Sequence, residues 1–287
     1  MHDQLKRLRT SDGATVAYRI WKPGAPRRLL ALLHGVASNM TRWSEFVDHT
    51  SLGESWDLLR LDLRGHGLSL YRGRLDMGIW CDDLAAILRA EGYAQVVIAG
   101  HCFGADIGAE FAVRRPAETA GLILIEPLFR PALIGGMRRL AQTRPVCIPV
   151  ARVIRVLNAL GLHRRRLAPL DLEALDRQTR ARMAEEGSSE ALASYASPLA
   201  DLRTTATAAY LQALIAVTGP MPDLRAIRTP ALALLTTGGG FSNPVVTNRL
   251  LEALRGLQIV RLEAHHWIPT EQPEAMRKAI ESWCLAQ

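Results

Sequence analysis

Long apolar segments are missing from this sequence of 287 residues. No apolar run is long enough to span a bilayer, which argues against a transmembrane helix. The polar start, MHDQLKRLRT, lacks the apolar core of a signal peptide. We therefore predict a cytoplasmic protein without a membrane span.

Cysteine is also scarce. The four cysteines, Cys81, Cys102, Cys147 and Cys284, lie far apart and lack the CxxC spacing of a zinc site or redox motif. We interpret them as reduced thiols and predict neither a metal nor a cofactor. No nucleic-acid recognition motif accompanies the basic charge, so nucleic acid is not a predicted partner.

Lysine is absent between Pro127 and Thr229. That segment holds 15 arginines and 8 acidic residues, so it carries the whole net charge of +7. Arginine suits bidentate contacts to phosphate or carboxylate. We therefore consider an anionic partner for this segment, with a solvated, arginine-biased helical surface as the alternative.

A strand–turn–helix pattern surrounds Cys102. The apolar run 95–99 predicts a buried strand, and the Ala-rich stretch that begins near Phe103 predicts a helix. Between them, GHCFG at 100–104 has the form Gly-x-nucleophile-x-Gly of a nucleophile elbow. The sharp turn needs glycine on both sides, and a helix N-terminus favours a thiolate. Cys102 is thus the candidate nucleophile, and a small buried cysteine is the alternative.

The remaining apolar runs alternate between strand and helix. Residues 13–21 alternate in polarity like an antiparallel edge strand. Further strands are predicted at 29–33, 56–63, 120–125, 230–236 and 258–262, and helices at 43–49, 79–90, 245–255 and 273–285. Residues 128–228 show no strand pattern and read as helices broken by Pro and Gly. This order predicts an α/β protein with a mostly parallel sheet and helices on both faces.

Four stretches, LLHGVASN, LDLRGHGLS, GHCFGA and AHHWIPTEQPEA, occur in the order and spacing of one known superfamily. The chain resembles the α/β-hydrolase fold superfamily, and its elbow cysteine makes it similar to a thioesterase-like member. The resemblance implies an α/β-hydrolase core at 1–127 and 229–287. It also implies an inserted helical cap, or lid, at 128–228.

The resemblance also implies the residues of the site. Backbone N–H groups of Val36 and Phe103 would form an oxyanion hole. His266 is expected as the catalytic histidine rather than His265, because it precedes an aromatic residue and a proline in the expected way. The residues expected to line the site are His34, Gly35, His101 and Trp267.

The third catalytic residue departs from the common pattern. The loop TTGGGFSN at 236–243, where most relatives carry an aspartate, has no carboxylate. A minority of the superfamily places the acid after the strand that follows the elbow helix, where this chain has Glu126. We predict that Glu126 orients His266 and stabilises its imidazolium. Asn243 is the alternative orienting group, and a helix-capping role for Glu126 also stays open.

A cysteine nucleophile narrows the expected chemistry. Attack of a thiolate on a thioester forms another thioester, so the acyl-Cys intermediate keeps a high transfer potential. We predict an enzyme with a Cys-His-Glu triad, a thioesterase that acts on acyl thioesters of coenzyme A or a carrier protein docked on the arginine-rich cap. The alternatives are an acyltransferase or cyclising release enzyme, an ester or lactone hydrolase, and a ligand-binding protein without turnover.

Overall fold

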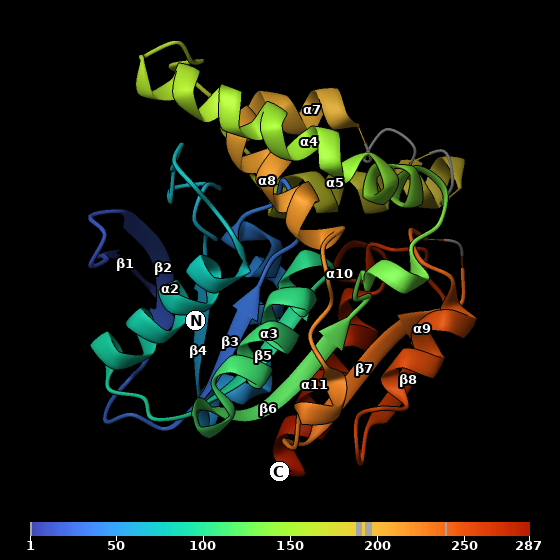
Figure 1. Ribbon diagram of the computed structural model, residues 1–287. Coiled ribbons are helices and arrows are strands. Elements are labelled where there is room, and N and C mark those ends of the chain that lie inside the picture. Colours follow the sequence, from blue (N-terminus) through green and yellow to red (C-terminus); the bar gives the residue numbers. More distant parts are fainter. Residues whose placement is uncertain (1, 188–190, 193–196, 239) are drawn as a thin grey trace.

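One sheet organises the computed structural model, which describes residues 2–187, 191–192, 197–238 and 240–287. Within these residues, eight strands follow the order β1-β2-β4-β3-β5-β6-β7-β8 (Figure 1). The strands are β1 (Gln4–Arg9), β2 (Thr15–Trp21), β3 (Arg28–Leu33), β4 (Trp56–Leu61), β5 (Val96–His101), β6 (Thr119–Ile125), β7 (Ala231–Thr236) and β8 (Gln258–Leu262). From β4 to β8 all neighbours pair in parallel. The predicted mostly parallel sheet is confirmed.

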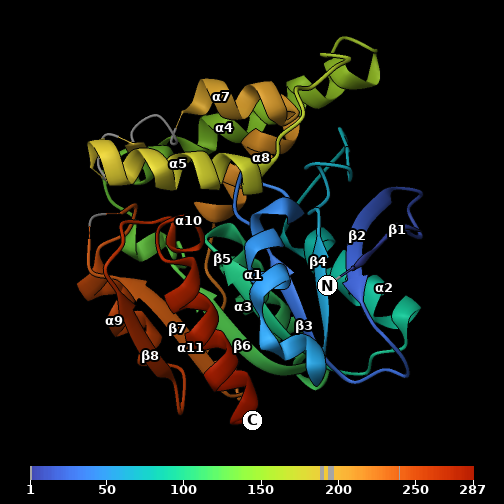
Figure 2. The same ribbon diagram turned by 180° about the vertical axis from the view of Figure 1, so that it is seen from behind.

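Helices cover both faces of this sheet. On one face lie α2 (Met77–Glu91), α3 (Phe103–Arg114) and α9 (Pro244–Leu251), and on the other lie α1 (Ser44–His49) and α11 (Pro273–Leu285) (Figures 1 and 2). Short turns of helix connect them: η1 (Met40–Trp43), η2 (Ser51–Glu54), η3 (Pro116–Glu118), η4 (Arg130–Ala132), η5 (Leu224–Ala226) and α10 (Ile268–Glu271). The central strands are buried on both sides, which explains their continuous apolar runs.

The N-terminal edge of the sheet differs from the sequence prediction. The antiparallel strand predicted over 13–21 forms as β2, but its predicted place at the edge is wrong, because β2 pairs with both β1 and β4. The edge strand is β1, whose sequence QLKRLR is mostly exposed. Its lysine and arginines protect the edge from pairing with another chain, and they also hide it from a search for apolar strands.

Two predicted strand ends also shift. Strand β5 continues through His101 instead of ending at 99, so the elbow turn is tighter than predicted. Strand β4 ends at Leu61 rather than at 63. The reason is Asp62, whose carboxylate accepts hydrogen bonds from the backbone N–H groups of Met40 and Leu68, both at 2.7 Å, and so turns the chain.

In the described part of the chain between β6 and β7, four helices lie over the carboxyl ends of the strands (Figures 1 and 2). These cap helices are α4 (Gly135–Ala159), α5 (Leu172–Glu186), α7 (Pro198–Thr204) and α8 (Thr207–Val217). They lie within the segment predicted as a cap, whose boundaries at 128 and 228 stay a prediction. Among the described helices, none has the length and apolarity needed to cross a membrane.

The longest cap helix corrects one expectation. Pro145 and Pro149 do not break α4, which runs through both as one helix of 25 residues. Each proline removes one N–H group and leaves the carbonyl four residues earlier without its helical partner. Both prolines are exposed on this surface helix, so water can reach the backbone beside them.

The elbow glycines set how closely α3 approaches the sheet. A Cβ atom on Gly104 would lie 2.3 Å from the carbonyl oxygen of Leu33, at the end of β3. A Cβ atom on Gly100 would lie 2.2 Å from the carbonyl oxygen of Gly104. Both distances are far below van der Waals contact. Only glycine therefore permits the turn from β5 into α3.

We expect Gly104→Ala to lower the free energy of unfolding by roughly 1–3 kcal/mol, the usual cost of forcing extra atoms into a packed interior. Gly24→Ala is the control, because a Cβ atom there meets nothing within 4 Å. Urea denaturation would measure both free energies of unfolding, provided that their dependence on urea concentration has the same slope as in the wild type. Equal stability of the two variants would show that α3 can move away from β3.

Candidate active site

Cys102 occupies a strained turn between β5 and α3. Its backbone has φ 55° and ψ −118°. Among the described residues, only three non-glycine residues have positive φ: Ala37, Cys102 and Glu126. Such conformations cost about 1–3 kcal/mol each and cluster at functional sites. Cys102 and Glu126 immediately follow the neighbouring strands β5 and β6, so the strain falls on two of the predicted catalytic residues.

The loop after β3 lies against the thiol. A Cβ atom on Gly35 would be 3.6 Å from the Sγ atom of Cys102. Among the described residues, neither the Val36 nor the Phe103 N–H group has a hydrogen-bond partner. Both groups are thus available to an oxyanion, as their predicted role requires.

His34 holds this loop in place. Its Nδ1 atom lies 2.8 Å from the carbonyl oxygen of Gly35, and its Nε2 atom accepts from the N–H group of Leu63 at 3.0 Å. Burial lowers the pKa of His34 well below its usual value, so the ring stays neutral. It positions the loop from behind and is not among the residues that line the cavity at Cys102.

His266 lies between Cys102 and Glu126. Burial disfavours its charged form, but the interactions with Cys102 and then Glu126 outweigh burial and raise its pKa to about 9. Its Nδ1 atom is 3.5 Å from Oε2 of Glu126. That distance is within ion-pair range, but the groups are not aligned as a hydrogen bond. Catalytic contacts in ligand-free structures are often loose and tighten when substrate binds.

His101 and Phe241 hold the His266 ring from other sides. The Nε2 atom of His101 donates to the carbonyl oxygen of His266 at 3.0 Å. Phe241 meets the His266 ring edge to face, with ring centroids 4.7 Å apart. Phe241 is a site residue that sequence reasoning missed, because a lone aromatic in a glycine-rich loop carries no motif.

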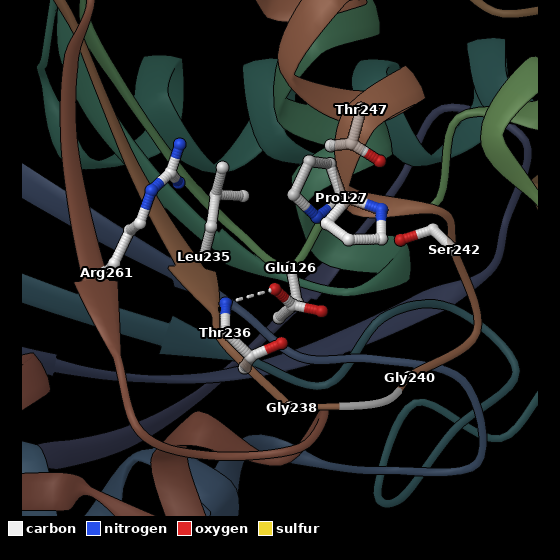
Figure 3. A pocket seen from close by; sticks show the side chains of 10 residues that line it. Glu126, Pro127, Leu235, Thr236, Gly238, Gly240, Ser242, Thr247 and Arg261 are labelled. Atoms are coloured by element: carbon white, nitrogen blue, oxygen red, sulfur yellow. Dashed lines mark hydrogen bonds between the residues drawn. The ribbon is translucent and has the colours of Figure 1, made fainter.

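Glu126 is anchored by one oxygen and faces His266 with the other. Oε1 accepts from the N–H group of Thr236 at 2.7 Å (Figure 3). A small cavity of about 20 Å³ beside the carboxylate has room for about one water molecule. It is lined by Pro127, Leu235, Thr236, Gly238, Gly240, Ser242, Pro244, Thr247 and Arg261 (Figure 3).

The two alternative residues are engaged elsewhere. Asn243 caps α9, because its Oδ1 atom accepts from the N–H groups of Val245 and Val246 at 3.0 and 3.2 Å. His265 pairs with Glu271, with Nδ1 and Oε2 3.0 Å apart. The geometry therefore favours Glu126 over Asn243 as the partner of His266. Gly239, in the same loop, lies outside the described residues.

A cavity of about 410 Å³ opens at the thiol, between the sheet and the cap helices. Most of its wall is apolar, from Leu128, Met137, Leu170, Leu172, Leu175 and Leu214. The predicted site residues on its wall are Gly35, Val36, His101, Cys102, His266 and Trp267. The arrangement can hold an apolar acyl chain with its carbonyl group at Cys102.

Three polar groups near the cavity were not predicted. Asp201 and Tyr210, from the cap helices, line the cavity and share a hydrogen bond of 3.1 Å. Burial raises the pKa of Asp201 to about 6. Asp106, on α3, accepts from the N–H group of Leu128, and burial raises its pKa to about 8. No sequence motif marks these residues, since only the folding of the cap and of α3 brings them near the site.

The raised pKa of His266 gives a test of its partners. Glu126→Gln should lower this pKa from about 9, because it removes one of the two groups that favour imidazolium. In the wild type, the raised pKa contributes stability that is complete below the unfolded value of 6.5 and is lost as pH rises through about 9. NMR titration of the imidazole, with unfolding measured across that window, would show both effects.

Asn243→Ala is the control for that titration. It should cost about 1 kcal/mol of stability through the lost α9 cap and leave the His266 pKa unchanged. A lower pKa in Asn243→Ala, with no change in Glu126→Gln, would assign the orienting role to the 236–243 loop.

Residues 24–265 match the family model described as "Serine aminopeptidase, S33". Lipase LipV of Mycobacterium tuberculosis is 31% identical over 105 residues, which are 37% of this chain and 39% of that protein. The chain spans only 34–41% of the length of the first three curated relatives.

Solved structures match over the whole chain. A hydrolase from Pseudomonas aeruginosa PA01 has a TM-score of 0.71 and 20% identity, with 98% of both chains covered. A thioesterase domain from the curacin biosynthetic pathway has a TM-score of 0.66 and 15% identity, with 100% of both chains covered. At such identities the likeness shows the fold alone.

Proposed function

The chain belongs to the serine aminopeptidase S33 family of α/β hydrolases, and we propose that it hydrolyses acyl thioesters through an acyl intermediate on Cys102. Membership makes it an enzyme of the α/β-hydrolase class. The family is named for serine, whereas this chain has cysteine at the elbow. The observation that carries the proposal is the thiol itself, at a strained elbow beside a buried histidine with a raised pKa.

The first half of the proposed reaction transfers the acyl group to sulfur. The Cys102 thiolate attacks the carbonyl carbon, and the N–H groups of Val36 and Phe103 stabilise the oxyanion. The tetrahedral intermediate collapses, and its carbon–sulfur bond to the leaving group breaks. His266 imidazolium gives its proton to the departing thiolate.

The second half returns the enzyme to its starting state. Neutral His266 takes a proton from a water molecule as its oxygen attacks the acyl-Cys carbonyl. The bond from carbon to Sγ of Cys102 breaks, and the products are a carboxylic acid and the thiolate–imidazolium pair. An amine, alcohol or thiol in place of water would give acyl transfer by the same route.

The nature of the nucleophile supports thioesters over amides. A thiolate leaving group departs without full protonation, whereas an amine must be protonated as it leaves. The apolar wall of the cavity favours an aliphatic or aromatic acyl chain.

Hydrolysis of oxygen esters is the second candidate. The lipase relative, at 31% identity, and the apolar cavity favour it. The two candidates differ in the leaving group, because an alkoxide needs the proton of His266 more than a thiolate does. Rates on matched thioester and ester pairs with one acyl chain would separate them.

Acyl loading tests the proposed intermediate. Intact mass after incubation with a panel of acyl thioesters should show one acyl group per chain, and Cys102→Ala should abolish it. Cys102→Ser should fold but lose thioester turnover, because an arrangement that serves a thiol need not activate a hydroxyl. Measurement of kcat/KM for both variants would complete the test.

The other cysteines provide controls. Cys81 and Cys284 are fully buried, and burial raises the pKa of each thiol to about 12, so neither should load. Cys147→Ser should behave like the wild type, because Cys147 lies on α4 and is not among the cavity-lining residues. Loading that persists in Cys102→Ala would refute the intermediate.

A further inference from the structure

The outer face of α4 carries an apolar stripe. Its members follow spacings of four and three residues, which places them on one side of a helix. They are Val146, Val150, Val153, Leu157 and Leu160, the last immediately after α4, and their exposed fractions run from 39% to 70%. Such a row of exposed Val and Leu side chains is unusual, because soluble proteins rarely expose large contiguous apolar patches.

The opposite face of α4 already has its partner. Ala141 and Ala151 are buried there. Arg144 donates to the carbonyl oxygen of Ile215 at 3.1 Å, and Arg155 donates to Oε1 of Gln212 at 3.2 Å. Ile215 and Gln212 belong to α8, so α8 fixes the helix by its inner side. Figure 1 shows α4 in front of α8, with its other side directed away from the protein.

Positive charge surrounds the stripe. Helix α4 has five arginines and no Asp or Glu. Three of them, Arg138, Arg139 and Arg152, do not bond α8 and are exposed. The triplet Arg164–Arg166, just beyond the helix, is exposed as well. Leu162, 65% exposed, lies between the helix end and that triplet. The stripe, Leu162 and these six arginines together form the α4 face.

We propose that the α4 face docks on the surface of an anionic lipid bilayer. A helix with an apolar stripe and basic flanks lies in the plane of the interface, with the stripe among acyl chains and the arginines at headgroup phosphates. Anionic lipid satisfies both halves of the face at once. This inference does not depend on the proposed reaction.

Other occupants fit the face less well. A second copy that used the same face would bring two arginine-rich surfaces together, because a two-fold contact joins identical patches. An acidic carrier protein would match the arginines but would need its own apolar row to cover a stripe more than three turns long. A dimer and a bound carrier protein are therefore distinct outcomes of the binding experiment.

Docking at the α4 face would also orient the active site. Met137, in the first turn of α4, lines the cavity that contains Cys102. The helix that contacts lipid is therefore continuous with the wall of the acyl-chain cavity. A substrate or product held in the bilayer would be close to that wall.

Vesicle sedimentation with the full chain tests the proposal. Binding should be strong to vesicles of phosphatidylcholine mixed with phosphatidylglycerol, weaker to phosphatidylcholine alone, and reduced by added salt. Val150→Asn with Val153→Asn should weaken binding by roughly tenfold or more. Arg165→Gln with Arg166→Gln should weaken it by about fivefold for each arginine.

Matched variants outside the cap helices are the controls. Val245→Asn, at a 68% exposed valine on α9, and Arg74→Gln, at an exposed arginine before α2, should bind vesicles like the wild type. All variants should keep the circular dichroism spectrum, since every changed side chain is exposed.

Three results would overturn the proposal. One is no binding to anionic vesicles. Another is binding that neither the stripe nor the arginine variants reduce. The third is evidence that the α4 face binds another partner and does not bind vesicles. That evidence would be a dimer in light scattering or capture of an acidic carrier protein, either one lost in the stripe variant.

Discussion

The site depends on how closely the start of α3 approaches the end of β3. The carbonyl oxygen of Leu33 occupies the space that a side chain on Gly104 would need. This approach brings the loop that contains Val36 next to the thiol and places Cys102 at the N-terminus of α3. The position of Cys102, the proposed oxyanion-hole N–H groups beside it and the electrostatic field at the N-terminus of α3 thus follow from one steric condition.

Backbone hydrogen bonds hold Cys102 and Glu126 in their strained conformations. The N–H group of Cys102 donates to the carbonyl oxygen of Ile125 at 2.8 Å, and that of Glu126 donates to Leu234 at 3.0 Å. Each strained residue is therefore held by the next strand of the sheet. Cys102 and Glu126 are fixed relative to each other, because Cys102 bonds to Ile125, the last residue of β6, and Glu126 directly follows it.

The sequence predicted what local pattern controls. The GHCFG turn predicts the elbow, because only glycine fits on either side of this turn. Buried parallel strands are recognisable in the sequence as apolar runs. The charged edge strand β1 was not predicted, because it joins the sheet by pairing with β2 and has no apolar run that would mark it. The prolines of α4 led to the wrong prediction of a helix break. A helix exposed to water tolerates prolines, because water can reach the carbonyl groups that lose their helical partners.

The contacts of the site were less accessible to sequence reasoning. The family resemblance predicts Glu126 from its place after a strand, and the structure adds the Thr236 bond and the approach to His266. Asp201 and Tyr210 reach the cavity only because the cap helices fold over the sheet. Such contacts depend on tertiary packing, for which the sequence carries no local signal.

The order of the proposed catalytic residues along the chain has a consequence for biosynthesis. Cys102, its oxyanion donors and Glu126 all precede the cap helices, whereas His266 follows them. During translation the ribosome completes the nucleophile and the acid long before the base exists. The nascent thiol therefore lacks its proton acceptor until residue 266 has been added and has folded against β5 and β6. Under the proposed mechanism, reactivity toward acyl donors therefore arises late, and the unfinished chain would not be acylated at Cys102.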